Sequence, residues 1–264
     1  MIYINNQEKI DRLKLNLNDF YVVADFDRTL TEGASDSTWG IFANANQVGK
    51  EYKEKRTALY NKYRPIEIDP NISEEEKSKA MTEWWQLHIN LFYEYGVKEE
   101  AVKNAVKLGN MKYRDGAKEF LKRMHELNVP VIIVSAGIGN VIEEFLKLEN
   151  DFYDNIKIIS NFIVFENGEF KEIAGDIIHA LNKNIVRLDE DSKHNLENRK
   201  NILLLGDGFA DLKMISDKAK ENAITVGFLD EKIEESLELY NKGFDIVLTN
   251  LSSFEDVNNI LKIY

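Results

Sequence analysis

Five short apolar runs, separated by stretches with helical periodicity, constrain the fold of this chain more than any other feature. The runs are built almost entirely of Val, Ile and Leu without polar residues at alternate positions, which is typical of strands covered by helices on both faces. They span residues 21–25, 130–134, 156–160, 201–205 and 224–228, with a sixth candidate at 245–249. This alternation predicts an α/β fold with a doubly wound parallel sheet, in which ligands bind beyond the carboxyl ends of the strands.

Helical patterns fill the intervals between these runs. We expect helices over residues 116–127, 138–148, 210–219, 232–240 and 254–262. Residues 162–170 carry a different signal, because two alternating arms surround Asn167-Gly168, a pair that favours a tight hairpin turn.

One long stretch, from about Gly33 to Met111, interrupts the alternation of strands and helices. It contains charged helical patterns at 48–63, 73–95 and 98–108, interrupted at Pro65 and Pro70. A connection of this length needs structure of its own. We expect a catalytic core formed by residues 1–32 and 112–264, with a helical cap inserted at 33–111. Such a cap is well placed to cover a ligand site, although a helical extension that only packs remains an alternative.

Composition excludes several functional classes. Among 264 residues, 46 are acidic and 34 basic, so the formal net charge is -12 and argues against binding polymeric nucleic acid or an anionic membrane surface. The chain has no cysteine, which excludes disulfides, zinc-thiolate clusters and thiol nucleophiles. No apolar run approaches the ~18 residues of a membrane span, and the N-terminus lacks a signal-peptide pattern. We expect a soluble, cytoplasmic protein.

Paired aspartates follow two of the predicted strands. Asp25 and Asp27 follow the first strand, and Asp207 and Asp211 follow the strand at 201–205. Carboxylates that share a pocket repel one another unless a cation joins them, and ligands that are all oxygen select a hard ion such as Mg²⁺. Solvated loop aspartates, or an Asp211 that only caps a helix, are the simpler alternatives. The coincidence at two strand ends predicts a magnesium site.

A phosphate seat is predicted near these acids. Ser135, Ala136 and Gly137 follow the strand at 130–134 and offer a hydroxyl and backbone N–H groups at the start of a helix, an arrangement that binds anions. For the cation that holds phosphate we favour Lys183, which follows an apolar stretch, over Lys193 and Lys200 in a charged run. A dinucleotide site is disfavoured, since the glycine pattern fails at Ile142 and no acid follows the next strand.

Together these four elements resemble the motifs of the haloacid dehalogenase superfamily of aspartate-dependent phosphohydrolases. DFDRTLT is similar to its first motif, VIIVSAG to its second, Lys183 to its third and GDGFAD to its fourth. The blocks YRPIEIDP, VIIVSAGIGNVIEE, IKIISNFIVFENGEF and IIHALNK further resemble the cytosolic 5'-nucleotidase III family, also called pyrimidine 5'-nucleotidases. This resemblance implies a Rossmann-like core, a helical cap, Mg²⁺, and dephosphorylation of nucleoside 5'-monophosphates.

The resemblance also implies roles for individual residues. It makes Asp25 the nucleophile, Asp27 the general acid and base, and Asp25, Asp27 and Asp207 the metal ligands. Ser135 and Ala136 would contact the phosphate, Lys183 would neutralise it, and Glu67 of IEIDP would contact the substrate. We place Asp211 beyond the direct ligands, where it orients a water or Lys183. We also expect Thr29 to hydrogen-bond the carboxylates.

Departures from the family pattern leave the base preference open. His88 replaces the family's serine, and Asn140 replaces its usual aspartate. We expect His88 in the pocket and at most one of Trp84 and Trp85 lining it, with Tyr63 as another candidate for base stacking. The leading hypothesis is a monomeric Mg²⁺-dependent 5'-nucleotidase, favouring pyrimidines. The alternatives are a phosphatase of another small metabolite, a nucleoside phosphotransferase, and a non-catalytic nucleotide-binding module.

Overall fold

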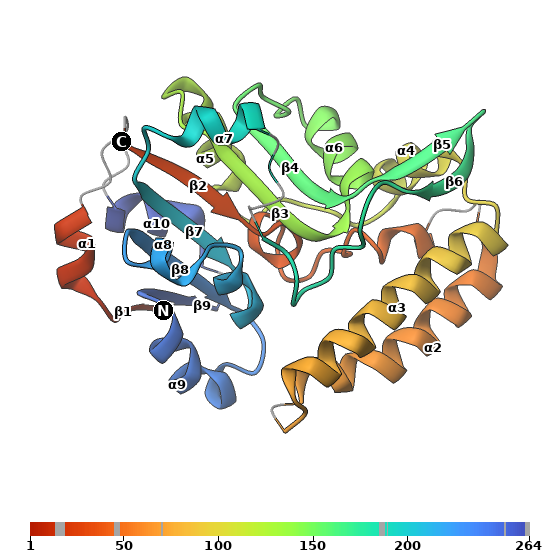
Figure 1. Ribbon diagram of the computed structural model, residues 1–264, viewed down its shortest axis with the longest axis horizontal. Coiled ribbons are helices and arrows are strands. Elements are labelled where there is room, and N and C mark those ends of the chain that lie inside the picture. The colour runs from red at the N-terminus through yellow and green to blue at the C-terminus, as the bar shows by residue number, and fades with distance from the viewer. Residues whose placement is uncertain are drawn as a thin grey trace.

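The protein is described from a computed structural model, which places residues 1–13, 19–44, 48–69, 71–184, 188, 190–250 and 252–261. Within these residues, a seven-stranded sheet has the order β1-β9-β8-β7-β2-β3-β4 (Figure 1). Its strands are β1 (Ile2–Ile4), β2 (Phe20–Ala24), β3 (Val131–Ile138), β4 (Ile156–Asn161), β7 (Asn201–Gly206), β8 (Ala223–Leu229) and β9 (Ile246–Thr249). All pairs are parallel except β1 with β9.

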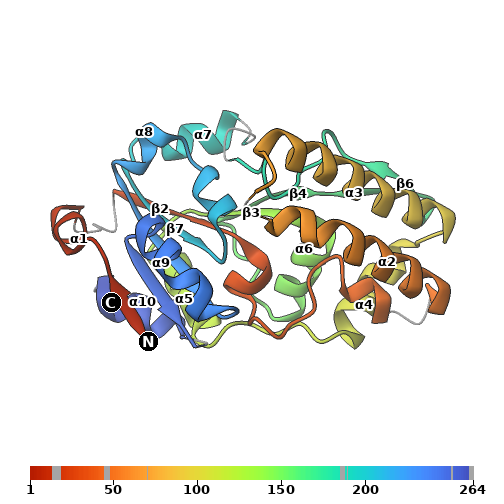
Figure 2. The same ribbon diagram turned by 90° about the horizontal axis from the view of Figure 1, so that it is seen from below.

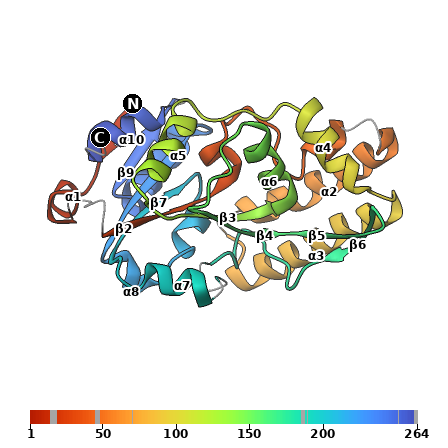
Figure 3. The ribbon, with the colours of Figure 1, turned by 90° about the horizontal axis from the view of Figure 1, so that it is seen from above.

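Helices cover both faces of this sheet, as the apolar strands require. One face packs against α5 (Ala117–Glu126), α6 (Gly139–Leu148) and α10 (Phe254–Leu261), and the other against α7 (Glu190–Leu196) and α8 (Asp217–Lys220) (Figure 3). Helix α9 (Ile233–Gly243) packs over Val247 of β9 on the second face. Successive side chains of β2 therefore enter different apolar clusters. Val22 packs on the face covered by α5, α6 and α10, and Val23 packs on the opposite face.

The six predicted strands are confirmed, with shifts of a few residues at their ends. The sequence patterns missed β1, α1 (Gln7–Leu13) and α7, which are too short for a clear period. The single helix expected at 210–219 is wrong. It is divided into the 3₁₀ helix η4 (Phe209–Lys213) and α8, because the Ser216 side chain accepts from Ala219 N and starts a new helix.

The inserted segment forms a helical cap beside the sheet. Helices α2 (Gly49–Ile68) and α3 (Glu74–Glu94) lie side by side, with α4 (Glu99–Leu108) nearby (Figure 2). The interruption expected at Pro65 is wrong, since α2 continues through it to Ile68. Pro65 lies in the last turns, where the loss of one N–H donor is outweighed by packing of the buried Tyr52 and Tyr63. Pro70 lies outside the described residues.

The cap is joined to the core by two segments that run antiparallel to each other. Thr31 and Tyr113 form an isolated β-bridge, Glu32 N donates to Lys112 O at 3.0 Å, and Asp36 N donates to Asn110 O at 2.7 Å. The division at 32/33 and 111/112 remains a prediction, and this two-stranded joint lies at its boundary. One continuous apolar cluster extends from β2 and β3 into α2 and α3.

The predicted hairpin is present and packs against the cap. Strands β5 (Ile163–Glu166) and β6 (Glu169–Ile173) are joined by Asn167 and Gly168, both with positive φ (54° and 81°), as a tight primed turn requires. The Phe170 ring lies 6.0 Å from that of Phe92 on α3. The hairpin, which follows β4 in the sequence, therefore packs against a cap that precedes β3 in the sequence.

The described helices were compared with the length and hydropathy that a membrane span requires. None of them meets both requirements.

Candidate active site

Strand β2 delivers Asp25 to the carboxyl edge of the sheet. The chain turns immediately through η1 (Phe26–Leu30), where Arg28 adopts a left-handed φ of 65°. The buried Arg114 holds this turn: its Nε donates to Thr29 O at 3.0 Å, and its Nη2 donates to Arg28 O and pairs with Asp230 at 2.7 Å. A left-handed conformation at a residue other than glycine costs about 1 kcal/mol or more, so these contacts keep the turn in place.

Lys183 joins two of the aspartates in the interior. Its Nζ lies 2.5 Å from Asp25 Oδ1 and 2.5 Å from Asp211 Oδ1, and all three residues are buried. Burial by itself lowers the pKa of the Lys183 ammonium, but the Asp211 and Asp25 carboxylates raise it further, so the net shift is upward. The structure thus brings together Asp25, Lys183 and Asp211, as predicted, whereas Lys193 pairs with Glu190 on α7.

Three aspartates lie close together in this region, which among the described residues contains a single lysine, Lys183. One carboxylate oxygen from each of Asp25, Asp207 and Asp211 lies within 4.8 Å of the other two. Burial raises the pKa of Asp25 well above its ordinary value, opposed by Lys183 and reinforced by Asp211 and Asp207. Burial and the Asp211 charge likewise raise the pKa of Asp207. A cluster of oxygens that resists ionisation fits a hard divalent cation, which would relieve the repulsion.

The placement of Asp211 beyond the direct ligands, where it orients a water or Lys183, stays a prediction. Its Oδ2 accepts from Gly208 N at 2.9 Å, its Oδ1 faces Lys183, and one of its oxygens lies in the same 4.8 Å cluster as those of Asp25 and Asp207. The Tyr240 hydroxyl donates to the Asp207 carbonyl at 2.5 Å and so holds the turn that carries both acids.

Asp27 faces away from this cluster, toward the start of the cap. Its carboxylate accepts from Thr38 N at 3.0 Å and from Thr38 Oγ1 at 2.9 Å. Burial raises the pKa of Asp27 to about 6, although both hydrogen bonds from Thr38 oppose the shift. The expected contact of Thr29 with the carboxylates is confirmed, since its Oγ1 donates to Asp25 Oδ2 at 3.4 Å.

The last residues of β3, where its pairing with β4 becomes irregular, are held by donors from several directions. Ser135 Oγ accepts from Gly137 N at 3.0 Å. The Ala136 carbonyl accepts from the indole N–H groups of Trp39 (2.9 Å) and Trp85 (2.8 Å), and from Asn161 Nδ2 at 3.0 Å. A Cβ at Gly137 would lie 1.9 Å from Thr38 Oγ1, so glycine is required there. The predicted anion seat is therefore tied directly to the cap.

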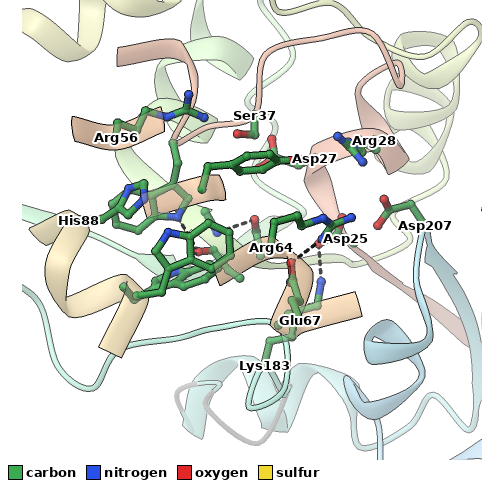
Figure 4. Close-up of a pocket in the computed structure, with 18 residues that line it drawn as sticks. Asp25, Asp27, Arg28, Ser37, Arg56, Arg64, Glu67, His88, Lys183 and Asp207 are labelled. Carbon is green, nitrogen blue, oxygen red and sulfur yellow. Dashed lines mark hydrogen bonds and ion pairs between the residues drawn. The ribbon is translucent and has the colours of Figure 1, made fainter. Parts of the chain in front are cut away.

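One pocket joins the aspartates to the cap (Figure 4). The predicted residues that line it are Asp25, Asp27, Glu67, His88, Ser135, Ala136, Gly137, Lys183 and Asp207. Glu67 is bound by Arg64 Nη1 on the same helix, and His88 is buried beside Trp39. Asn140 lies elsewhere and exchanges hydrogen bonds with the backbone of Ile163.

The expectation that at most one of Trp84 and Trp85 lines the pocket is wrong. Both do, because their rings stand nearly perpendicular, at 84° with centroids 5.0 Å apart, and indoles at adjacent helical positions are long enough to reach one cavity. Tyr63 is not in the lining and stacks on the far side of Trp84 (13°, 5.8 Å).

Sequence reasoning missed seven residues of the lining, Arg28, Ser37, Trp39, Arg56, Tyr60, Arg64 and Ala180, together with Thr38 behind Asp27. Arg28 and Ala180 lie within DFDRTLT and IIHALNK, whereas the others belong to no motif of the core. The signal for Arg56 and Arg64 was their spacing of eight residues on an amphipathic helix, which places both on one face.

A cluster of acids and a buried lysine lie at the carboxyl edge of a parallel sheet, beneath a cap that is inserted after β2. This arrangement defines a phosphohydrolase of the haloacid dehalogenase type. Residues 26–264 match the family model described as Pyrimidine 5'-nucleotidase (UMPH-1), and the chain belongs to this family. It is a 5'-nucleotidase, a phosphomonoester hydrolase.

Relatives and solved structures agree with this assignment. The chain is 36% identical over 265 residues to 7-methylguanosine phosphate-specific 5'-nucleotidase A of Xenopus laevis (97% of this chain, 91% of the relative), and 34% identical to the Homo sapiens 7-methylguanosine phosphate-specific 5'-nucleotidase (97% and 88%). A structure of cytosolic 5'-nucleotidase IIIB bound to cytidine superposes with a TM-score of 0.83 at 27% identity, covering 99% of this chain and 93% of that one. A phospho-aspartyl intermediate analogue of phosphoserine phosphatase shares the fold, at a TM-score of 0.56 and 18% identity, covering 93% and 98%.

Proposed function

We propose that the protein hydrolyses nucleoside 5'-monophosphates through an aspartyl-phosphate formed on Asp25. The observation that carries this proposal is the contact of Asp25 Oδ1 with Lys183 Nζ at 2.5 Å, at one end of a pocket whose other end is aromatic. A phosphate dianion repels an anionic nucleophile, so attack requires that positive charge already surround the carboxylate. Lys183 supplies part of that charge.

Asp25 acts as the nucleophile. A carboxylate oxygen of Asp25 attacks phosphorus in line, the bond from phosphorus to the 5'-oxygen breaks, and its electron pair leaves with that oxygen. Asp27 donates the proton that the leaving oxygen needs, then takes a proton from the water that attacks the acyl phosphate. Inorganic phosphate leaves and the Asp25 carboxylate is restored. Thr38 keeps the Asp27 carboxyl turned toward the leaving group by two hydrogen bonds.

The end of β3 seats the phosphate. Because Ser135 Oγ accepts from Gly137 N, its own proton can donate to a phosphate oxygen. The three donors on the Ala136 carbonyl fix the orientation of the peptide that follows it. We assign Ser135, Ala136 and Gly137 to phosphate binding and Glu67 and His88 to the nucleoside.

Asp25, Asp207 and Asp211 would hold Mg²⁺, with the backbone carbonyl of Asp27 as a further ligand. When bound, the ion neutralises charge on the phosphoryl oxygens. Titration calorimetry tests this assignment without activity: Mg²⁺ should bind the wild type and fail to bind Asp207→Asn, while Asp217→Asn, an exposed control, should bind normally. Chelation should also abolish phosphate release. Equal Mg²⁺ binding by both variants would refute the assignment.

The next point is which base the nucleotide substrate carries. The family model is named for pyrimidine nucleotides, one similar structure holds cytidine, and the relatives act on 7-methylguanosine phosphate by name. Our expectation of a pyrimidine stays a prediction, as do a monomeric state and a cytoplasmic location. The decisive experiment measures phosphate release from nucleoside 5'- and 3'-monophosphates, 7-methylguanosine 5'-monophosphate included, with and without acceptor nucleosides. Release from 5'-monophosphates alone supports the proposal, transfer to an acceptor indicates a phosphotransferase, and no release refutes it.

A further inference from the structure

Two polar side chains from different cap helices meet at the end of the pocket away from Asp207. Arg56 of α2 and His88 of α3 both line the pocket, and Figure 4 shows them together. His88 is 6% exposed. Within the described residues, neither of its ring nitrogens has a hydrogen-bond partner, and the buried Nε of Arg56 has none either. Buried polar groups without partners cost free energy, and such a cost is tolerated where a ligand satisfies them.

At this end of the pocket, none of the described acids pairs with the positive charge of Arg56. In the part of the chain that the structure describes, the Arg56 guanidinium forms no salt bridge with a carboxylate, and Glu67, further along α2 toward Lys183, is already paired with Arg64. Burial, assisted by the Arg56 charge, lowers the pKa of His88 to about 3, so its imidazole is neutral at working pH. A neutral imidazole donates from one nitrogen and accepts at the other, whereas a guanidinium only donates.

Aromatic rings form the walls around this pair. The Trp39 centroid lies 5.1 Å from that of His88 at 80°, and the Trp84 centroid lies 5.9 Å away at 70°. Trp85 also lines the pocket. A flat heterocycle in the pocket can stack on the face of an indole that lines it, while its polar edge faces Arg56 and His88.

We propose that Arg56 and His88 recognise the lactam edge of a neutral base, an oxo group next to a ring N–H. Arg56 donates to the oxo oxygen, and the unprotonated nitrogen of His88 accepts from the ring N–H. Uracil, thymine, guanine and hypoxanthine present this edge. Cytosine and adenine present an amino group next to a bare nitrogen instead. His88 can adapt to the bare nitrogen by changing tautomer, but Arg56 cannot accept from an amino group, so Arg56 is the selective member of the pair.

This inference rests on the proposed function and is tested by substrates that differ only at that edge. The pairs are UMP against CMP, and IMP against AMP, within which ring size and sugar are identical. Because the loss of a hydrogen bond to a charged group costs roughly tenfold or more in kcat/KM, the wild type should prefer UMP and IMP by at least about tenfold. Arg56→Met should reduce both ratios to within about threefold, and Arg56→Lys should retain part of the preference.

Lys53→Met serves as the matched control, because Lys53 is exposed on the same helix. It should leave both ratios at the wild-type value. Ratios near one in the wild type, or ratios that Arg56→Met does not change, would overturn the inference while the 5'-nucleotidase activity stands. Quenching of tryptophan fluorescence by uridine and cytidine measures the preference without catalysis. Tighter binding of uridine by a wild type that releases no phosphate would support the inference and refute the proposed function, and equal binding of the two nucleosides would overturn the inference.

Discussion

The indole N–H of Trp85 donates to the backbone carbonyl of Ala136 at 2.8 Å. Trp39 makes a second such bond to the same oxygen at 2.9 Å. These two bonds attach the cap to the end of β3, to which we assign phosphate binding, in addition to the apolar cluster that cap and core share.

Trp85→Phe should weaken this attachment. The variant keeps an aromatic ring but removes the donor, and a hydrogen bond contributes about 0.5–1.5 kcal/mol. Trp84→Phe is a matched control, since within the described residues the buried Trp84 Nε1 has no partner. Urea unfolding should show Trp85→Phe less stable than Trp84→Phe by that amount. Equal destabilisation by the two changes would mean that the bond to Ala136 contributes nothing.

Arg114→Met should destabilise the fold. Arg114 is 2% exposed, pairs with Asp230 at 2.7 Å and holds the carbonyls of the turn after Asp25. Removing one partner of a buried ion pair leaves the other uncompensated, at a cost of about 3–5 kcal/mol. Lys242→Met, which breaks an exposed pair with Glu238, should cost far less, because water screens that pair. Chemical denaturation compares them, and a similar small loss in both variants would contradict the role of Arg114.

Stability should fall in acid through His88. Its pKa is lowered by burial from 6.5 to about 3, so between these values the unfolded chain binds a proton that the native chain does not. The contribution of neutral His88 is thus complete above pH 6.5 and is lost as the pH decreases toward 3, at up to about 1.4 kcal/mol per pH unit. The free energy of unfolding of His88→Gln should depend less steeply on pH in this window. An unchanged slope would show that His88 is not held neutral.

Thr38 should position Asp27 for proton donation. Thr38→Val removes the hydroxyl that donates to Asp27 Oδ2 at 2.9 Å, and we expect kcat for nucleotides to fall by roughly 10²-fold, the lower end of what acid catalysis contributes. Thr38→Ser keeps a hydroxyl and should lose much less. The comparison with 4-nitrophenyl phosphate, whose leaving group needs no proton, uses kcat/KM, which covers the steps up to the aspartyl-phosphate and not the later activation of water. By this measure the loss in Thr38→Val should be large with nucleotides and small with 4-nitrophenyl phosphate. An equal loss with both substrates would mean that Thr38 has only a structural role.

The core could be predicted from the sequence because strands buried on both faces leave a continuous apolar signature, and because the acids Asp25 and Asp207 follow directly after such strands. The cap pocket could not be predicted in the same way. Trp39, Arg56 and Arg64 meet there only after η2 (Ile41–Asn44), α2 and α3 have packed together, and in the sequence they look like ordinary residues of a charged, amphipathic stretch. Pro65 and the split helix at 210–219 show that tertiary packing and a capping serine override local patterns.

The central claim is that Asp25 carries the phosphoryl group. Enzyme quenched in acid during turnover of a nucleoside 5'-monophosphate, then reduced with borohydride and digested, should yield homoserine at position 25, the product of a reduced aspartyl-phosphate. Asp25→Asn should give no such product and should release almost no phosphate. Phosphate release by Asp25→Asn near the wild-type rate, or homoserine at another aspartate in the wild type, would contradict the claim.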